Sequence, residues 1–208
     1  MFYLTGCVNK VVLPHLQRQE LGFMNTPNIG NRLRSRWIWA ADNGCFGKNY
    51  VGDKRWYAWL GRFTHDQASR CLFATAPDVP GDAAATLERS VAWLPRIREL
   101  GLPPALVAQD GLTIEDTPWA ALDALFIGGT TDWKMSEEVA GLIRAAKDRG
   151  KWVHIGRVNS RRRYLYMARL GADSADGTKI SFAPEECGPK IVGWCEWHRT
   201  NPPLPLYE

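Results

Sequence analysis

The sequence lacks any apolar run that approaches the roughly eighteen residues of a membrane-spanning helix. It also lacks a cysteine framework, because its five cysteines are scattered and odd in number, which is typical of a reduced compartment. The opening stretch MFYLTGCVNK has no charged region ahead of a long apolar segment, so we expect no signal peptide. Together these absences predict a cytoplasmic protein without membrane contact.

Low-complexity segments and internal repeats are missing as well. The composition, 45% hydrophobic and 23% charged, is that of an ordinary globular protein. A chain of 208 residues can bury one sizeable core, so we expect a single domain over 1–208. The net charge of +4 permits a polyanionic partner without requiring one.

Short apolar runs recur along the chain, and each ends in a polar or glycine-containing loop. Such runs without clean alternation are typical of parallel strands that are buried on both faces. The runs cover 2–7, 37–44, 72–82, 105–111, 124–129, 152–157 and 172–178.

Helical patterns separate these runs. Ser136 and Asn159 are each suited to cap a helix, and glycines follow the expected helix ends. The expected helices cover 53–63, 82–100, the segment from Ser136 to Gly150, and the segment from Asn159 to Leu170.

Alternation of strands and helices predicts an α/β fold with a parallel sheet, either an open doubly wound sheet or a closed barrel. No G-x-G-x-x-G follows the first strand, which weakens the dinucleotide-binding form of the open sheet. Polar residues fall at the ends of at least five strands, as in barrel active sites. We therefore predict a compact, slightly degenerate (β/α)8 TIM-type barrel, with KISFA (179–183) as the best candidate for the eighth strand.

Polar and glycine residues gather where the expected strands end. They are Asp42, Asp78, Gln109, Asp110, Gly128, Gly129, Arg157, Asp173 and Asp176. Each one alone suits a turn or a cap, but their joint occurrence favours one pocket at the barrel mouth. Carboxylates beside an amide and free backbone groups suit a planar heterocycle rich in N–H groups. A further carboxylate could attack an anomeric carbon.

Five segments in order resemble the tRNA-guanine transglycosylase superfamily, whose members insert 7-deazaguanine bases into nucleic acid. ADNGCFG is similar to its D-S-G-G-F segment, VAQDG to V-Q-G-G, FIGGTTD to I-G-G and GADSADGT to G-I-D-M-F-D-C. APD at 76–78 falls where the family has its second base-recognition aspartate. The chain is closest in size to the small, largely viral members that act on DNA.

This resemblance implies that guanine is exchanged for a 7-deazaguanine, with DNA as the expected partner and RNA not excluded. Asp176 would be the nucleophile of a covalent glycosyl intermediate, and Asp42 would help to hold the purine and would be a candidate for handling the proton. The base would be bound by Asp78, Gln109, Gly128 and Gly129. Residues three apart on a strand end point to opposite faces, so Asp173 is expected to face away from the pocket.

The C-terminal cysteines are the residues to consider as ligands of a metal ion. Cys187, Cys195 and His198 supply at most three ligands, whereas a structural zinc site needs four, so we expect no zinc and no other cofactor.

Clustered arginines favour a nucleic-acid partner. Arg161, Arg162 and Arg163 stand in the first turn of a helix, where cations oppose the helix dipole but would suit phosphate. With Arg157 they are expected to contact nucleic acid. Arg32, Arg34 and Arg36 form either a second basic cluster or the solvent face of a strand.

Other functions stay open on the sequence alone. They are modification of RNA, a barrel enzyme that acts on a free nucleoside or sugar phosphate, and a nucleic-acid-binding subunit without catalysis. A homodimer is also compatible with the sequence.

Overall fold

Eight parallel strands form a closed barrel in the computed structural model, which describes residues 1–29 and 32–201. Each strand pairs with the next, and β8 returns to pair with β1. The strands are β1 (Phe2–Thr5), β2 (Gly22–Asn25), β3 (Trp39–Ala41), β4 (Cys71–Thr75), β5 (Pro104–Ala108), β6 (Ala124–Ile127), β7 (Trp152–Ile155) and β8 (Ser174–Asp176). The predicted (β/α)8 barrel is therefore confirmed.

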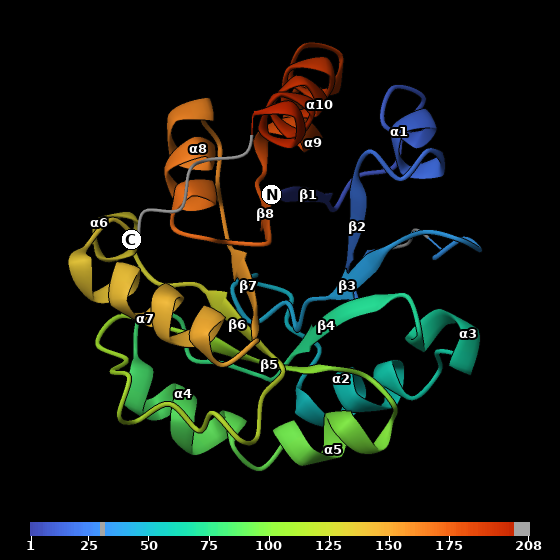
Figure 1. Cartoon of the computed structure of the whole chain (residues 1–208). Helices are drawn as coiled ribbons and strands as arrows, with labels where there is room; N and C mark the ends of the chain where they lie inside the picture. Colours follow the sequence, from blue (N-terminus) through green and yellow to red (C-terminus); the bar gives the residue numbers. More distant parts are fainter. Residues whose placement is uncertain (30–31, 202–208) are drawn as a thin grey trace.

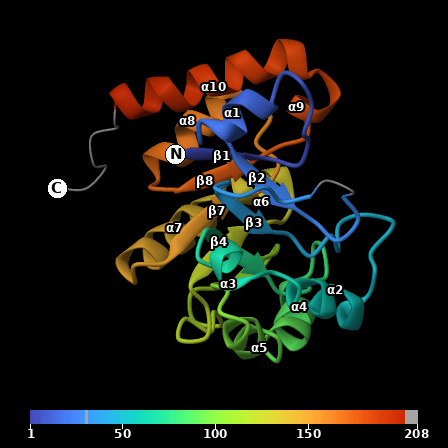
Figure 2. The same ribbon diagram turned by 90° about the vertical axis from the view of Figure 1, so that its right-hand side faces the viewer.

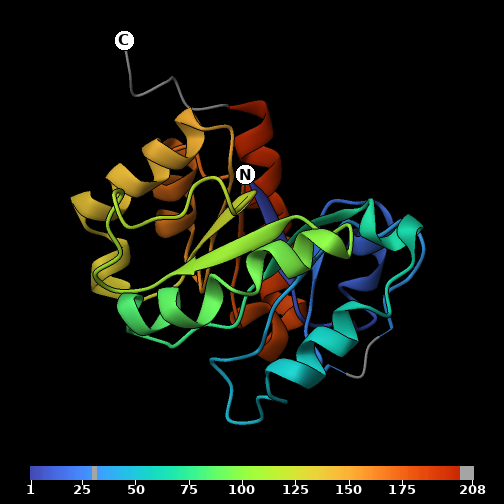
Figure 3. The same cartoon turned by 90° about the horizontal axis from the view of Figure 1, so that it is seen from below.

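Helices surround the strands on the outside of the barrel (Figures 1 and 3). They are α1 (Leu13–Gln17), α2 (Asp53–Leu60), α3 (His65–Ala68), α4 (Ala83–Ser90), α5 (Leu94–Glu99), α6 (Thr131–Lys134), α7 (Glu137–Asp148), α8 (Arg161–Arg169), α9 (Lys179–Phe182) and α10 (Pro184–Thr200). Figure 2 shows the long α10 running across the region where β1 meets β8. Within the described ranges, no helix is long and apolar enough to cross a membrane.

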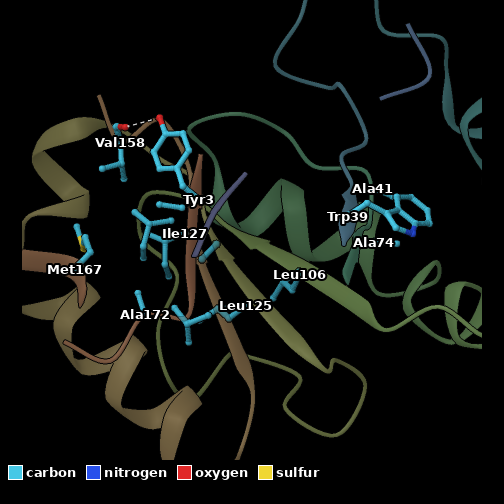
Figure 4. Packing of buried hydrophobic residues seen from close by; sticks show 14 of the residues in the cluster. Tyr3, Trp39, Ala41, Ala74, Leu106, Leu125, Ile127, Val158, Met167 and Ala172 are labelled. Carbon is cyan, nitrogen blue, oxygen red and sulfur yellow. Dashed lines mark hydrogen bonds between the residues drawn. The ribbon is translucent and has the colours of Figure 1, made fainter. Parts of the chain in front are cut away.

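Alternating side chains on each strand build two separate clusters of buried residues. A small cluster formed by Leu4, Met24, Ala40, Phe73, Ala105 and Ala124 comes from six of the eight strands. A larger cluster packs the strands against the helices, and Figure 4 shows part of it. There Tyr3 donates a buried hydrogen bond to the carbonyl of Val158, which links the first strand to the loop after β7.

Two sequence expectations for the elements are wrong. KISFA lies in the helix α9, and the missing strand is β2, whose four residues follow a polar stretch. The helix expected over 82–100 is two helices, α4 and α5. Pro95 lies in the first turn of α5, where a missing backbone N–H is tolerated. Because proline lacks this donor and its ring clashes with the preceding turn, α4 cannot continue through Pro95.

Of the two helix caps predicted from the sequence, one is confirmed and the other lies one residue further along the chain. Ser136 caps α7, because its hydroxyl accepts from the backbone N–H of Val139. Ser160, and not Asn159, caps α8. The side chain of Asn159 instead accepts from the backbone N–H of Lys179 and so joins the loops after β7 and β8.

Candidate active site

The loops after the strands enclose a cavity of about 440 Å³. The structure brings seven of the predicted site residues together in its lining, namely Asp42, Asp78, Gln109, Gly128, Gly129, Arg157 and Asp176. They lie at or just after the ends of β3, β4, β5, β6, β7 and β8, which is how a barrel builds a mouth from many strand ends. What each does to a substrate stays a prediction at this point.

Asp78 is 5% exposed, and two amides hold its carboxylate. Asn43 Nδ2 donates to Oδ1 over 2.9 Å, and Gln109 Nε2 donates to Oδ2 over 2.5 Å. Burial raises the pKa of Asp78, while these two hydrogen bonds act in the opposite direction. Each oxygen keeps a second acceptor position, so the fixed carboxylate is suited to accept a pair of coplanar N–H groups.

Gln109 uses both ends of its amide within the protein. Besides its bond to Asp78, its Oε1 accepts from the backbone N–H groups of Gly81 at 3.0 Å and Gly129 at 2.9 Å. Gly129 has φ +58, and a Cβ there would lie 2.4 Å from the ring of Trp133. Gln109, which follows β5, therefore joins its own loop to the loops after β4 and β6. Only glycine fits at position 129, where the loop after β6 turns.

Asn43 is a site residue that the sequence analysis did not single out. Its Nδ2 donates to Asp78 and to the carbonyl of Ala76, and its Oδ1 accepts from the backbone N–H of Cys45. Gly44, with φ +77, turns the chain directly after it. The Asn-Gly pair thus serves as a turn and as the support of Asp78 at once.

Asp42 is half-buried and faces the cavity. Burial raises its pKa to about 7, the N–H of Gly44 opposes this, and the charges of Asp176 and Asp78 raise it further. A carboxyl group with this pKa can both donate and accept a proton near neutral pH.

Asp176 ends β8 and is held through one oxygen. Its Oδ1 accepts from the backbone N–H of Arg157 at 3.0 Å and lies 3.2 Å from Nε2 of His154. Arg157 has φ +61, a backbone conformation that residues other than glycine rarely adopt. Its guanidinium donates to the carbonyl of Gly129. His154 does not stand out in the sequence, because one histidine within an apolar strand is typical of a core residue.

Asp173 faces the outer layer, as predicted from its spacing to Asp176. It forms an ion pair with Lys147 of α7, whose Nζ lies 2.6 and 2.7 Å from the two carboxylate oxygens. It also accepts from the backbone N–H of Val153. The two aspartates of GADSADGT thus have separate roles.

The three arginines of α8 lie outside the cavity lining. Arg161 and Arg162 are exposed, and the Arg161 guanidinium lies 5.1 Å from the ring centroid of Trp197 on α10. A contact of these arginines with DNA stays a prediction.

The residues considered for zinc lie on α10, where Cys195 is buried. Over the part of the chain that is described, no group of three or more histidine, cysteine, aspartate or glutamate side chains could hold a metal ion.

Comparison with known proteins supports the fold alone. No protein-family model matches the chain, and no curated protein matches it. Among solved structures, the tryptophan synthase A-subunit from the hyperthermophile Pyrococcus furiosus is similar, with 15% identity, a TM-score of 0.56 and coverage of 93% of this chain and 94% of that one. Two mutants of that subunit match at 14% identity with the same TM-score.

These findings overturn the transglycosylase resemblance and the base-exchange function drawn from it. No family model supports that superfamily, and the structural neighbours belong to another family of barrels. The physical reason lies in the segments themselves. Aspartate, asparagine and glycine at successive strand ends are what many barrel mouths require, so their order reflects the barrel more than one chemistry.

Proposed function

We propose that the barrel mouth is the active site of an enzyme that acts by acid–base catalysis on a small, planar molecule with N–H donors. The observation that carries this proposal is Asp42, a carboxyl group in a cavity at the strand ends whose pKa burial raises to about 7. Enzymes on this fold place their chemistry at this face of the barrel.

The lining supports the substrate class. Carboxylates from three loops reach the cavity, and Arg157 is the one cation among the lining residues that the structure describes. This balance favours a ligand that donates hydrogen bonds or carries positive charge, and it disfavours an anion. Apolar side chains of Phe46, Val107 and Phe126 also line the cavity, and flat rings pack well against such walls.

Asp42, Asp176 and Asp78 would each have a different role in the reaction. Asp42 in its acid form would give a proton to a ring nitrogen or to a departing atom, and would later return to that form by taking a proton back. Asp176, anchored through Oδ1, would face positive charge that develops on the substrate. Asp78 would orient the ring through its N–H groups.

A matched pair of ligands tests the substrate class. We expect 2-aminobenzimidazole, which is bicyclic, planar and rich in N–H groups, to raise the melting temperature, because a ligand that binds only the folded state stabilises it. Indole-2-carboxylate, of similar size but anionic, should have no effect. Asp78→Asn should weaken binding of the first ligand, since one acceptor oxygen becomes a donor. Equal binding of both ligands would contradict the proposal.

Catalysis is tested separately by incubating the protein with a pool of small nitrogen-containing metabolites and following their masses. We expect one compound to be consumed by the native protein and to persist with Asp42→Asn. Asp132→Asn, at an exposed position on α6, is the matched control. Consumption that continues with Asp42→Asn would exclude Asp42 as the proton carrier.

A further inference from the structure

A line of three side chains leads from Asp176 into the barrel wall. His154 Nε2 lies 3.2 Å from Asp176 Oδ1, and His154 Nδ1 lies 2.8 Å from Ser174 Oγ. Trp152 Nε1 donates to the same Ser174 Oγ over 2.8 Å. His154 and Ser174 are both 0% exposed, so the hydrogen bond between them is shielded from bulk water.

The chemistry of the groups fixes the direction of each hydrogen bond. The indole of Trp152 can only donate, so Ser174 Oγ accepts from it and keeps its own hydrogen for another partner. If the hydroxyl gives that hydrogen to His154 Nδ1, the ring proton resides on Nε2 and points at Asp176. The other tautomer would set a nitrogen lone pair against a carboxylate oxygen, which is repulsive.

The surroundings of His154 favour a neutral ring. The rings of Phe73 from β4 and Phe126 from β6 pack against it, with centroids 4.9 and 4.6 Å away. Burial lowers its pKa, the contact with Asp176 opposes this, and the charge of Lys134 lowers it further. The ring therefore offers Asp176 a hydrogen bond without adding a positive charge to the cavity.

We propose that His154 is a positioning residue for Asp176, a neutral imidazole locked in the Nε2–H tautomer by Ser174 and Trp152. The imidazole N–H and the backbone N–H of Arg157 converge on Oδ1 and so fix the plane of the carboxylate. Its importance for catalysis rests on the proposed function, because it acts through the carboxylate that would face the substrate. The tautomer itself does not depend on that function.

Nitrogen-15 NMR of histidine-labelled native protein tests the tautomer directly. We expect the His154 signals of an unprotonated Nδ1 and a protonated Nε2, unchanged from about pH 6 to about pH 8, where an ordinary histidine titrates. A protonated Nδ1, or a ring that gains a proton within this range, would overturn the proposal. No variant has to fold for this measurement.

Two variants test the effect on Asp176 through its carboxyl carbon-13 signal. His154→Leu removes the donor, so the Asp176 carboxyl signal should move away from its native chemical shift. His154→Gln can still donate an N–H and should restore most of the native chemical shift. An unchanged signal in folded His154→Leu, or an equal displacement in both variants, would mean that His154 only fills space. Failure of 2-aminobenzimidazole to bind would remove the proposed function but leave this result intact.

Discussion

At the scale of single residues, Asp42 should make the stability of the protein depend on pH. Its pKa in the folded state is about 7, above the ordinary value of about 4 in an unfolded chain. The folded state therefore holds this proton more tightly, and the stability gained is present at low pH and is lost as pH rises through 7. Asp42→Asn should become more stable relative to the native protein between about pH 5 and about pH 8. Urea unfolding at both values measures this change.

The control for this experiment is Asp132→Asn, which removes an exposed carboxylate. Its difference in unfolding free energy from the native protein should stay the same at both pH values. If Asp42→Asn behaved in the same way, the Asp42 carboxyl would not be held in an environment that disfavours its charge.

Single residues also define what the sequence could reveal about the site. Asp42, Asp78 and Asp176 were predictable because each follows an apolar run, and strand ends of a barrel meet at one mouth. Asn43 and His154 were not, because their importance lies in partners distant in the chain. Asn43 bonds a residue 35 positions away, and His154 one 22 positions away. No local pattern encodes such a pairing.

At the scale of elements, the cap of α7 should contribute measurably to stability. Ser136 accepts from the N–H of Val139, and two glutamates follow it in the first turn. Ser136→Ala should cost about 1 kcal/mol, because the first turn loses a partner for one N–H group. Ser136→Asp should restore the loss, since a carboxylate caps and also suits the helix dipole. Chemical denaturation of the three proteins tests this. Equal stability of all three would mean that the first turn contributes nothing.

Most strands and three helices could be located from the sequence, and the missed strand and the wrong assignment of KISFA share one cause. The seven expected strands are apolar enough to stand out, whereas β2 begins with Gly22 and ends in Asn25, so Phe23 and Met24 are its only large apolar residues. KISFA looks like a strand by composition, yet Lys179 to Phe182 form a helical turn on the chain that leads to α10. Composition sets a weak local preference, and closure of the barrel decided both cases.

At the scale of the whole molecule, the layout of the barrel explains why the resemblance to one family misled. Eight strands deliver polar loops to one face in a fixed order, whatever the chemistry of the enzyme. The sequence could therefore predict the mouth and its acidic character. It could not supply the substrate, because shape and partner contacts in the cavity arise only when six loops come together.

Closure of the barrel should depend on α10, which packs on β1 and α8 next to the pairing of β1 with β8. Ile191 of α10 is 2% exposed within the large apolar cluster, so Ile191→Ala should cost about 2–5 kcal/mol. For a chain of this size the melting temperature should fall by roughly 2–4 °C per kcal/mol. Glu196→Ala, exposed on the same helix, should change it little. Calorimetry should show one transition in both variants, and equal melting temperatures would mean that α10 does not unfold together with the barrel.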